Sequence, residues 1–223
     1  VIAAPVSAIA SESRESIHAA ALAAVERFDA AELESTLRGA AMRLGMDEML
    51  DGVIGPLLLT IGSRWHAGLL SPAHEHLATA VVRRTLTWMM ENGTPPPMAP
   101  AIVVATLAGQ THELGAMLAA AAASSHGWRV VYLGANLPAR DIAVAANHTR
   151  ATAVALSLLH PTEDPTIAGA LRDLSAALPA STAIIAGGTA AASYAPALAA
   201  VGASQFGSIR ELRAWLRGAT KTR

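Results

Sequence analysis

One histidine of the chain lies where a ligand-binding side chain is expected. It is His112, within the stretch QTHELG at residues 110–115, which follows the apolar run AIVVATL at residues 101–107 and opens an alanine-rich segment. This order predicts a strand, a loop and a helix. In an open parallel sheet, ligands bind outside the carboxyl ends of the strands, so we expect His112 to face the binding crevice. An imidazole in that place is suited to hold a metal ion, and the simpler alternative is that it caps the following helix.

A second group of side chains surrounds a predicted connection between two helices. Trp65 and His66 end one predicted helix, and Glu75 and His76 lie one turn into the next. An antiparallel helical hairpin brings these four side chains to the same end of a bundle. An alternative is a zinc site formed by His66, His74, Glu75 and His76. Successive residues project about 100° apart on a helix, however, so no more than two of the three residues from 74 to 76 easily face one ion.

The first part of the chain predicts four helices with short connections, which is typical of a helix bundle. Two helix starts are marked by capping residues: Asp29 with Glu32 three positions later, and Ser71 followed by Pro72. Pro56 is expected to kink the third helix, because it lacks the N–H that the previous turn needs. The predicted helices cover residues 13–28, 29–44, 47–66 and 71–91.

A polar and proline-rich stretch then marks a change from helical to strand-like periodicity. We therefore place a helical domain at residues 1–92, a linker at residues 93–98 and an α/β domain at residues 99–223. Strands too apolar to alternate predict a five-stranded parallel sheet, Rossmann-like in general and flavodoxin-like in order, with helices on both faces. The predicted strands cover residues 101–107, 128–133, 152–157, 181–186 and 203–206, and the helices residues 113–126, 138–147, 163–178, 190–200 and 208–217.

The composition excludes several classes of function. With 223 residues, 52% of them hydrophobic and 15% charged, the chain predicts a globular protein with a large core. Its net charge of −1 gives no basic field for nucleic acid, and the absence of cysteine excludes thiolate chemistry and favours the cytoplasm. The uncharged residues 174–209 are broken by prolines and glycines and do not predict a membrane span. Dinucleotide, NTP-binding and serine-hydrolase fingerprints are missing, so these chemistries are not expected.

The spacing around His112 resembles the Asp-x-His-x-x-Gly signature of cobalamin-binding domains, in which the histidine is the lower axial ligand of cobalt. The Ser-Leu-Leu sequence at residues 157–159 and the Gly-Gly pair at residues 187–188 match two further parts of that family's pattern, at the ends of the third and fourth predicted strands. The resemblance implies that His112 ligates cobalt. It also implies that the cofactor is bound by Gln110, Thr111, Gly115, Ser157, Leu159, Gly187 and Gly188.

The helical domain carries a second resemblance. Trp65, nine further residues and then Glu75 and His76 resemble the Trp-x9-Glu-His signature of CarH-type adenosylcobalamin-dependent photoreceptors, and the likeness extends over nearly the whole chain. It implies a sensor or binding module and not an enzyme, in which the helical domain caps the upper face of adenosylcobalamin. Trp65 would cover the adenosyl group, and Glu75 and His76 would contact that group and its surroundings. His66 would ligate cobalt once light has removed the adenosyl group, with a light-dependent change of homo-oligomeric state.

Two departures from these families affect the expectations. Gln110 stands where the signature has Asp, so its amide oxygen is expected to accept the second N–H of His112, and a neutral partner predicts weaker ligation of cobalt. The helix-turn-helix of the transcriptional members is missing, so we expect this segment to make no nucleic-acid contact. The output domain or partner is expected outside this chain. The missing initiator Met likewise suggests an excised piece of a longer protein.

Three alternatives remain open from the sequence. A corrinoid methyl carrier of a methyltransferase system shares the bundle, the linker and the lower histidine, but would leave its upper face open to a partner. A plain cobalamin store would show no response to light. A sensor holding an additional bilin such as biliverdin is a further variant, and without cysteine such a bilin would be bound noncovalently.

Overall fold

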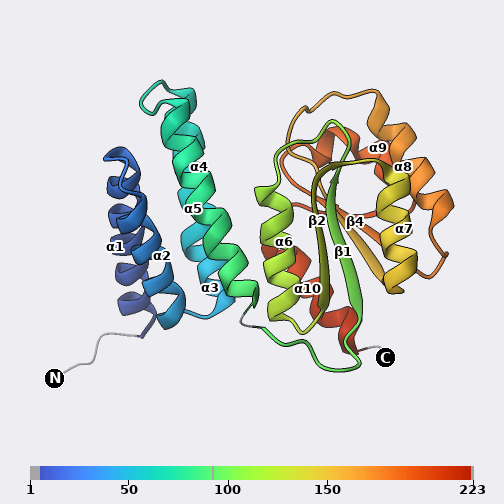
Figure 1. The fold of residues 1–223 in the computed structure, drawn as a ribbon, viewed down its shortest axis with the longest axis horizontal. Helices are drawn as coiled ribbons and strands as arrows, with labels where there is room; N and C mark the ends of the chain where they lie inside the picture. The colour runs from blue at the N-terminus through green and yellow to red at the C-terminus, as the bar shows by residue number, and fades with distance from the viewer. Residues whose placement is uncertain (1–5, 92, 222–223) are drawn as a thin grey trace. The chain divides into compact units, whose positions relative to one another are not determined.

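The computed structural model describes residues 6–91 and 93–221 and divides into two compact units, Val1–Glu91 and Asn92–Arg223 (Figure 1). Each unit has its own buried core, so each is described by itself. The predicted fold class, a helical N-terminal part followed by an α/β domain with a parallel sheet, is confirmed.

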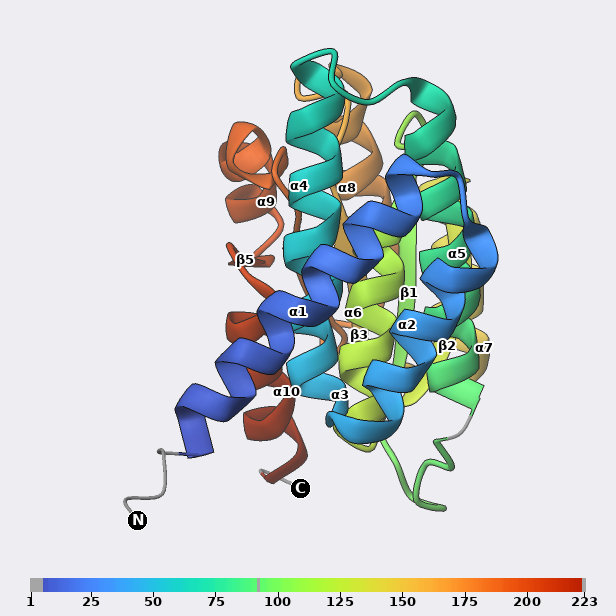
Figure 2. The ribbon, with the colours of Figure 1, turned by 90° about the vertical axis from the view of Figure 1, so that its left-hand side faces the viewer.

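The first unit is a bundle of antiparallel helices (Figures 1 and 2). Its core consists of aliphatic side chains at helical spacing, such as Leu33 and Leu37, which are fully buried. The side chain of Asp29 accepts the N–H of Glu32 at 2.9 Å, which is the predicted N-terminal cap of the second helix. The elements are α1 (Val6–Glu26), α2 (Ala30–Arg43), α3 (Met46–Met49), the π-helical turn η1 (Leu50–Ile54), α4 (Gly55–His66) and α5 (Pro72–Glu91).

Around Pro56, where the sequence predicts a kink, the third helix widens into a π-helical turn. Pro56 lies in the first turn of α4, and the N–H of Gly55 reaches back five residues to the carbonyl of Leu50. A wider turn is one way in which a helix tolerates a residue without an N–H. A Cβ at Gly55 would lie 2.9 Å from that same carbonyl oxygen, so glycine suits this turn. The segments α3, η1 and α4 thus follow one another without a loop.

The second unit is a parallel sheet of five strands in the order β2-β1-β3-β4-β5, as predicted. Helices α6 and α10 cover one face and α7, α8 and α9 cover the other (Figure 1). The elements are β1 (Ala101–Leu107), α6 (Leu114–Ser125), β2 (Arg129–Leu137), α7 (Ala139–Thr149), β3 (Ala153–Ser157), α8 (Thr166–Ala177), β4 (Ala183–Gly187), the 3₁₀ helix η2 (Ala191–Tyr194), α9 (Ala195–Ala200), β5 (Ser204–Phe206) and α10 (Ile209–Lys221).

Strand β2 is longer than predicted and irregular at its end. Its pairing with β1 shifts register twice, and Gly134 and Asn136 adopt positive φ angles of 85° and 63°. The backbone N–H of Asn136 donates to the hydroxyl of Thr106 at 2.9 Å, and its side-chain oxygen accepts the N–H of Gly109 at 2.9 Å. These contacts fasten the end of β2 to the loop that carries His112. None of the described helices is long and apolar enough to cross a membrane.

Candidate functional site

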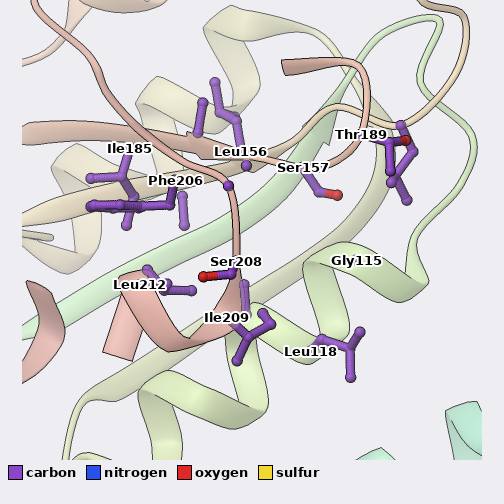
Figure 3. A pocket seen from close by; sticks show the side chains of 17 residues that line it. Gly115, Leu118, Leu156, Ser157, Ile185, Thr189, Phe206, Ser208, Ile209 and Leu212 are labelled. Carbon is purple, nitrogen blue, oxygen red and sulfur yellow. The ribbon is translucent and has the colours of Figure 1, made fainter. Parts of the chain in front are cut away.

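A cavity of about 250 Å³ lies in the second unit, against the carboxyl-terminal halves of β3 and β4 (Figure 3). Side chains of α6, β5 and α10 complete its wall. Most of the lining is apolar. The five residues that the sequence singles out on these strands and on α6 all line it: Gly115, Ser157, Leu159, Gly187 and Gly188. The structure therefore brings together three segments that the sequence links only by pattern.

Ser157 is the polar side chain that distinguishes this cavity. It is only 5% exposed, and its hydroxyl has no hydrogen-bond partner among the described residues. Figure 3 shows the hydroxyl beside the cavity, across from Gly115 at the start of α6. A buried hydroxyl without a partner costs roughly 1–3 kcal/mol, so its retention indicates a partner that is not part of the protein. A Cβ at Gly115 would lie 2.4 Å from this oxygen, so glycine keeps the space beside it open.

The glycine pair at the end of β4 allows two strand ends to meet closely. Gly188 has a φ of +106°, and a Cβ there would lie 2.3 Å from the carbonyl oxygen of Leu158. The N–H of Leu158 donates to the carbonyl of Gly187 at 2.8 Å, and the N–H of Ala190 donates to the carbonyl of Leu158 at 3.0 Å. No other residue type fits this crossing without moving backbone. The pair thus shapes the wall of the cavity.

His112 lies exposed in the loop between β1 and α6. The alternative that it caps the helix is wrong, because the N-cap position of α6 is Glu113. Glu113 instead accepts the hydroxyl of Tyr132 at 2.8 Å. The ring of His112 lies against that of His160, with 5.7 Å between the centroids and 87° between the planes. Thr111 is exposed in the same loop. An exposed imidazole beside the carboxyl end of the sheet is available to a ligand.

Gln110 does not play the predicted part. Its side-chain oxygen accepts two backbone N–H groups, from Leu159 at 3.0 Å and from His160 at 3.2 Å, and its NH2 donates to the carbonyl of Pro161 at 3.1 Å. An amide oxygen has two lone pairs, and both are used. The expected acceptor for the second N–H of His112 is therefore engaged elsewhere. Gln110, 1% exposed, instead fastens the loop between β3 and α8 to the loop that carries His112.

Replacing Gln110 by Ala is expected to destabilise the second unit by about 2 kcal/mol, because two backbone N–H groups and one carbonyl lose their partner in a partly buried place. Urea unfolding of the purified chain measures this loss. Gln205→Ala, at an exposed position on β5, is the control and should change stability by less than about 0.5 kcal/mol. An equal and small effect of both variants would contradict the role given to Gln110.

The sequence did not predict a second set of hydrogen bonds that holds the loop between β3 and α8. The hydroxyl of Tyr194 donates to the carbonyl of Pro161 at 2.9 Å and accepts the N–H of Asp164 at 2.9 Å. The hydroxyl of Thr166, and then its backbone N–H, hold the pKa of the Asp164 carboxyl below its usual value. The sequence Asp-Pro-Thr at residues 164–166 is typical of such a turn, but the contact with Tyr194 depends on the tertiary fold.

In the first unit, Trp65 and His66 lie at the end of α4, where Trp65 is 43% exposed. The two rings meet edge to face, with 4.8 Å between their centroids. The Nδ1 atom of His66 lies 2.8 Å from the carbonyl oxygen of Gly62. A carbonyl only accepts, so Nδ1 carries a proton, and in the neutral imidazole the free lone pair is then on Nε2. His66 is thus an exposed imidazole already in the tautomer that ligates a metal through Nε2.

Glu75 and His76 lie one turn into α5, beyond the loop that follows His66. One carboxylate oxygen of Glu75 accepts the hydroxyl of Thr79 at 2.8 Å, and the other lies 3.4 Å from Nδ1 of His76. The Nδ1 atom of His74 accepts the backbone N–H of Ser71 at 3.1 Å, which uses this histidine as a helix cap. Within the described part of the chain, no group of three or more His, Asp or Glu side chains could hold a metal ion, so the zinc alternative lacks a ligand set.

The comparisons with known proteins agree with this geometry. A family model described as a B12 binding domain matches residues 100–211, and a second model with the same description matches residues 17–88. The chain is 31% identical over 181 residues to the HTH-type transcriptional repressor CarA of Myxococcus xanthus, covering 81% of this chain and 61% of CarA. It is 31% identical over 173 residues to the HTH-type transcriptional repressor CarH of the same organism, covering 78% of this chain and 58% of CarH. The chain thus spans about three-fifths of each relative's length.

A solved structure has a similar fold. The monomethylamine corrinoid protein of Methanosarcina barkeri superposes with a TM-score of 0.69, covering 88% of this chain and 94% of that protein, at 15% identity. At this identity the likeness concerns the fold alone. It agrees with a helical part followed by a Rossmann-like domain.

Proposed function

Because the chain belongs to the B12-binding domain family, we propose that it is a light-sensing module that holds adenosylcobalamin and responds when light removes the adenosyl group. The family match supports cobalamin as the cofactor, and the similarity to CarA and CarH supports a regulatory role. The resemblance to CarH-type photoreceptors is confirmed at the level of the family. The comparisons give no support to a bilin, which stays a prediction.

On the lower side of the cofactor, we assign cobalt ligation to His112 and binding of the cofactor's tail to the cavity of the second unit. The unpaired hydroxyl of Ser157 supports this assignment, because it offers a hydrogen bond that no described protein atom takes. Gly115 and Gly188 support it as well, because the space beside them closes if either gains a Cβ. The residues present therefore fit a group with an apolar body and a few polar atoms.

On the upper side, one observation carries the proposal: His66 presents a lone pair on Nε2 from an exposed position at the end of α4. Its Nδ1 is committed to the carbonyl of Gly62, so the tautomer does not have to change before the imidazole binds a metal. Trp65 lies against it and is 43% exposed, so its indole is available to cover a flat adenine. Glu75, held by Thr79, keeps a carboxylate at the start of the next helix for hydrogen bonds to a ribose.

When bound, adenosylcobalamin supplies a weak cobalt–carbon bond that visible light breaks. With adenosylcobalamin bound, Trp65 would exclude solvent from the adenosyl group, and Glu75 and His76 would contact it. Once light has removed that group, His66 would be placed to ligate cobalt through Nε2, and this ligation would pull on the end of α4. Because α4 follows the π-helical turn η1 without a loop, such a pull reaches a part of the helix whose hydrogen bonding is already irregular. A change of homo-oligomeric state, or of an output domain beyond this chain, is the proposed consequence.

The test uses the full chain reconstituted with adenosylcobalamin in darkness. Absorption spectra and gel filtration are recorded before and after green light for the wild type, for His66→Ala and for His148→Ala, which removes an exposed histidine at the end of α7. We expect the wild type and His148→Ala to reach a spectrum with a histidine on each side of cobalt and to change in apparent size. We expect His66→Ala to lose its adenosyl group without reaching that spectrum.

Other outcomes would support the alternatives. A cofactor that is bound but indifferent to light contradicts the sensor and favours a store. Transfer of a methyl group from the methylcobalamin-loaded chain to a partner favours a carrier. A far-red absorption band that stays with the protein after gel filtration with biliverdin would support the additional bilin, and free pigment would end that variant.

A further inference from the structure

The side chain of Gln110 leaves open which group orients His112. A histidine that ligates a metal usually has its second nitrogen, or its ring plane, fixed by a neighbour, and loss of that neighbour typically costs about 10–100-fold in metal affinity. Gln110 precedes His112 by two residues, but both lone pairs of its amide oxygen are taken by the N–H groups of Leu159 and His160. His112 itself is exposed, so its ring has few packing contacts to hold it.

The neighbour that the structure provides is His160. Its ring lies edge to face with that of His112, with 5.7 Å between the centroids and 87° between the planes. This separation and angle fall in the range that aromatic pairs prefer, about 4.5–7 Å with perpendicular rings. The contact restricts rotation of the His112 ring about its Cβ–Cγ bond, which is the motion that would turn its metal-binding nitrogen away.

The backbone of His160 is itself fixed. Its N–H donates to the side chain of Gln110 at 3.2 Å. The next carbonyl, of Pro161, accepts both the NH2 of Gln110 at 3.1 Å and the hydroxyl of Tyr194 at 2.9 Å. His160 is itself exposed, but one bond to its own N–H and two to the carbonyl of the next residue, from the buried side chains of Gln110 and Tyr194, hold its backbone in place. Gln110 thus acts on His112 indirectly, by fixing the residue that its ring packs against.

We propose that His160 is the positioning residue of His112, and that it acts through the contact between the two rings. The inference rests on the proposed function, because it concerns the lower ligand of cobalt. It assigns a function to a residue of the β3–α8 loop that no sequence motif marks.

The contact is tested first without cofactor. In the apoprotein we expect nuclear Overhauser effects between ring protons of His112 and His160. Their absence would overturn the inference whatever the protein binds. This measurement separates the inference from the proposed function, since it needs no cobalamin.

The effect on the ligand is then measured in the 223-residue chain loaded with cob(II)alamin, made by reducing bound hydroxocobalamin. Coordination of cobalt by one ordinary nitrogen atom splits the electron paramagnetic resonance lines into triplets. If the ligand is a histidine of the protein, labelling histidine with the isotope ¹⁵N turns these triplets into doublets. We expect His160→Ala to lower the ratio of histidine-bound to histidine-free cobalt about tenfold. His160→Phe keeps a ring and should stay within about twofold of the wild type. His148→Ala is the control and should equal the wild type.

Two results would overturn the inference. One is an unchanged ratio in His160→Ala, and the other is an equal loss in His160→Ala and His160→Phe. A wild type that binds cobalamin but shows triplets with the labelled histidine contradicts the assignment of His112 as ligand, and with it the proposed function. Gel filtration with the cofactor distinguishes loss of ligation from loss of binding in every variant.

Discussion

Gly188→Ala is expected to destabilise the second unit by about 4 kcal/mol, a large part of the 5–15 kcal/mol that typically holds a domain folded. Two effects add. The residue has a φ of +106°, which L-residues rarely adopt, and its Cβ would lie 2.3 Å from the oxygen and 2.9 Å from the carbonyl carbon of Leu158. These atoms belong to the backbone of Leu158, directly after β3, and cannot rotate away as a side chain could, so β3 and β4 must move apart.

The measurement is urea unfolding, read by hydrogen exchange in peptides that contain β3 and β4, so that the helical unit does not contribute. The control separates the two effects. Gly202 also has a positive φ, +66°, but a Cβ there meets nothing within 4 Å. Gly202→Ala should therefore cost only about 1 kcal/mol. Equal losses in the two variants would show that the backbone angle alone matters and that the crossing of the strand ends is not tight.

The layers of the second unit were predictable because its strands are buried runs of aliphatic residues with helices between them. The seven residues of β1 are all buried, and the sequence places this strand at its observed bounds. The end of β2 was not predictable, since it runs to Leu137 through two residues with positive φ. Its irregular pairing depends on Thr106, whose hydroxyl accepts the N–H of Asn136. That is a contact between segments 30 residues apart, which no local pattern encodes.

That the glycines and Ser157 lie close together was predictable from the sequence, whereas the hydrogen-bond partners of Gln110 were not; the binding of a cofactor by these residues stays a prediction. Gly115, Ser157 and Gly188 belong to a motif whose spacing the fold turns into a single cavity. Gln110 was expected to serve the residue two positions away, because a sequence shows near neighbours. Its partners are instead 49 to 51 residues away, and they became neighbours only when β3 paired with β1.

The tautomer of His66 illustrates a similar limit in the first unit. The sequence places a histidine at the end of a helix, but whether Nδ1 or Nε2 is free depends on the carbonyl that the ring meets. The structure gives Gly62, one helical turn earlier, at 2.8 Å. Helix geometry makes this carbonyl available to any histidine four residues later in the chain. The sequence therefore allows the contact, but the tautomer depends on the side-chain rotamer that the folded structure adopts.

Gly115→Ala is expected to weaken cobalamin binding about a hundredfold while the second unit stays folded, because the bound cofactor would be packed too tightly against the new methyl group. Overpacking by one methyl group costs about 1–3 kcal/mol, and each 1.4 kcal/mol of binding free energy changes the affinity about tenfold. Gly115 lies in the first turn of α6, where alanine is otherwise a better helix former. The new Cβ would lie 2.4 Å from the hydroxyl oxygen of Ser157 and 3.1 Å from Leu159. The hydroxyl must rotate, and the methyl group fills the space beside it.

Ser157 provides the decisive companion variant. Ser157→Ala removes a buried hydroxyl without a partner, so the apoprotein should become more stable by about 1 kcal/mol, although cobalamin binding should fall. The double variant Gly115→Ala/Ser157→Ala removes the clash between the new methyl group and the hydroxyl, so we expect the free energy of unfolding to recover but the affinity for cobalamin to stay low. Gly169→Ala is the control for the change of residue type, because Gly169 lies within α8 and a Cβ there would meet no atom closer than 3.9 Å.

Isothermal titration with hydroxocobalamin measures the affinity, and urea unfolding measures the free energy of unfolding. Opposite signs for stability and affinity in Ser157→Ala distinguish a hydroxyl kept for a ligand from one kept for the fold, and a loss of both would make Ser157 structural.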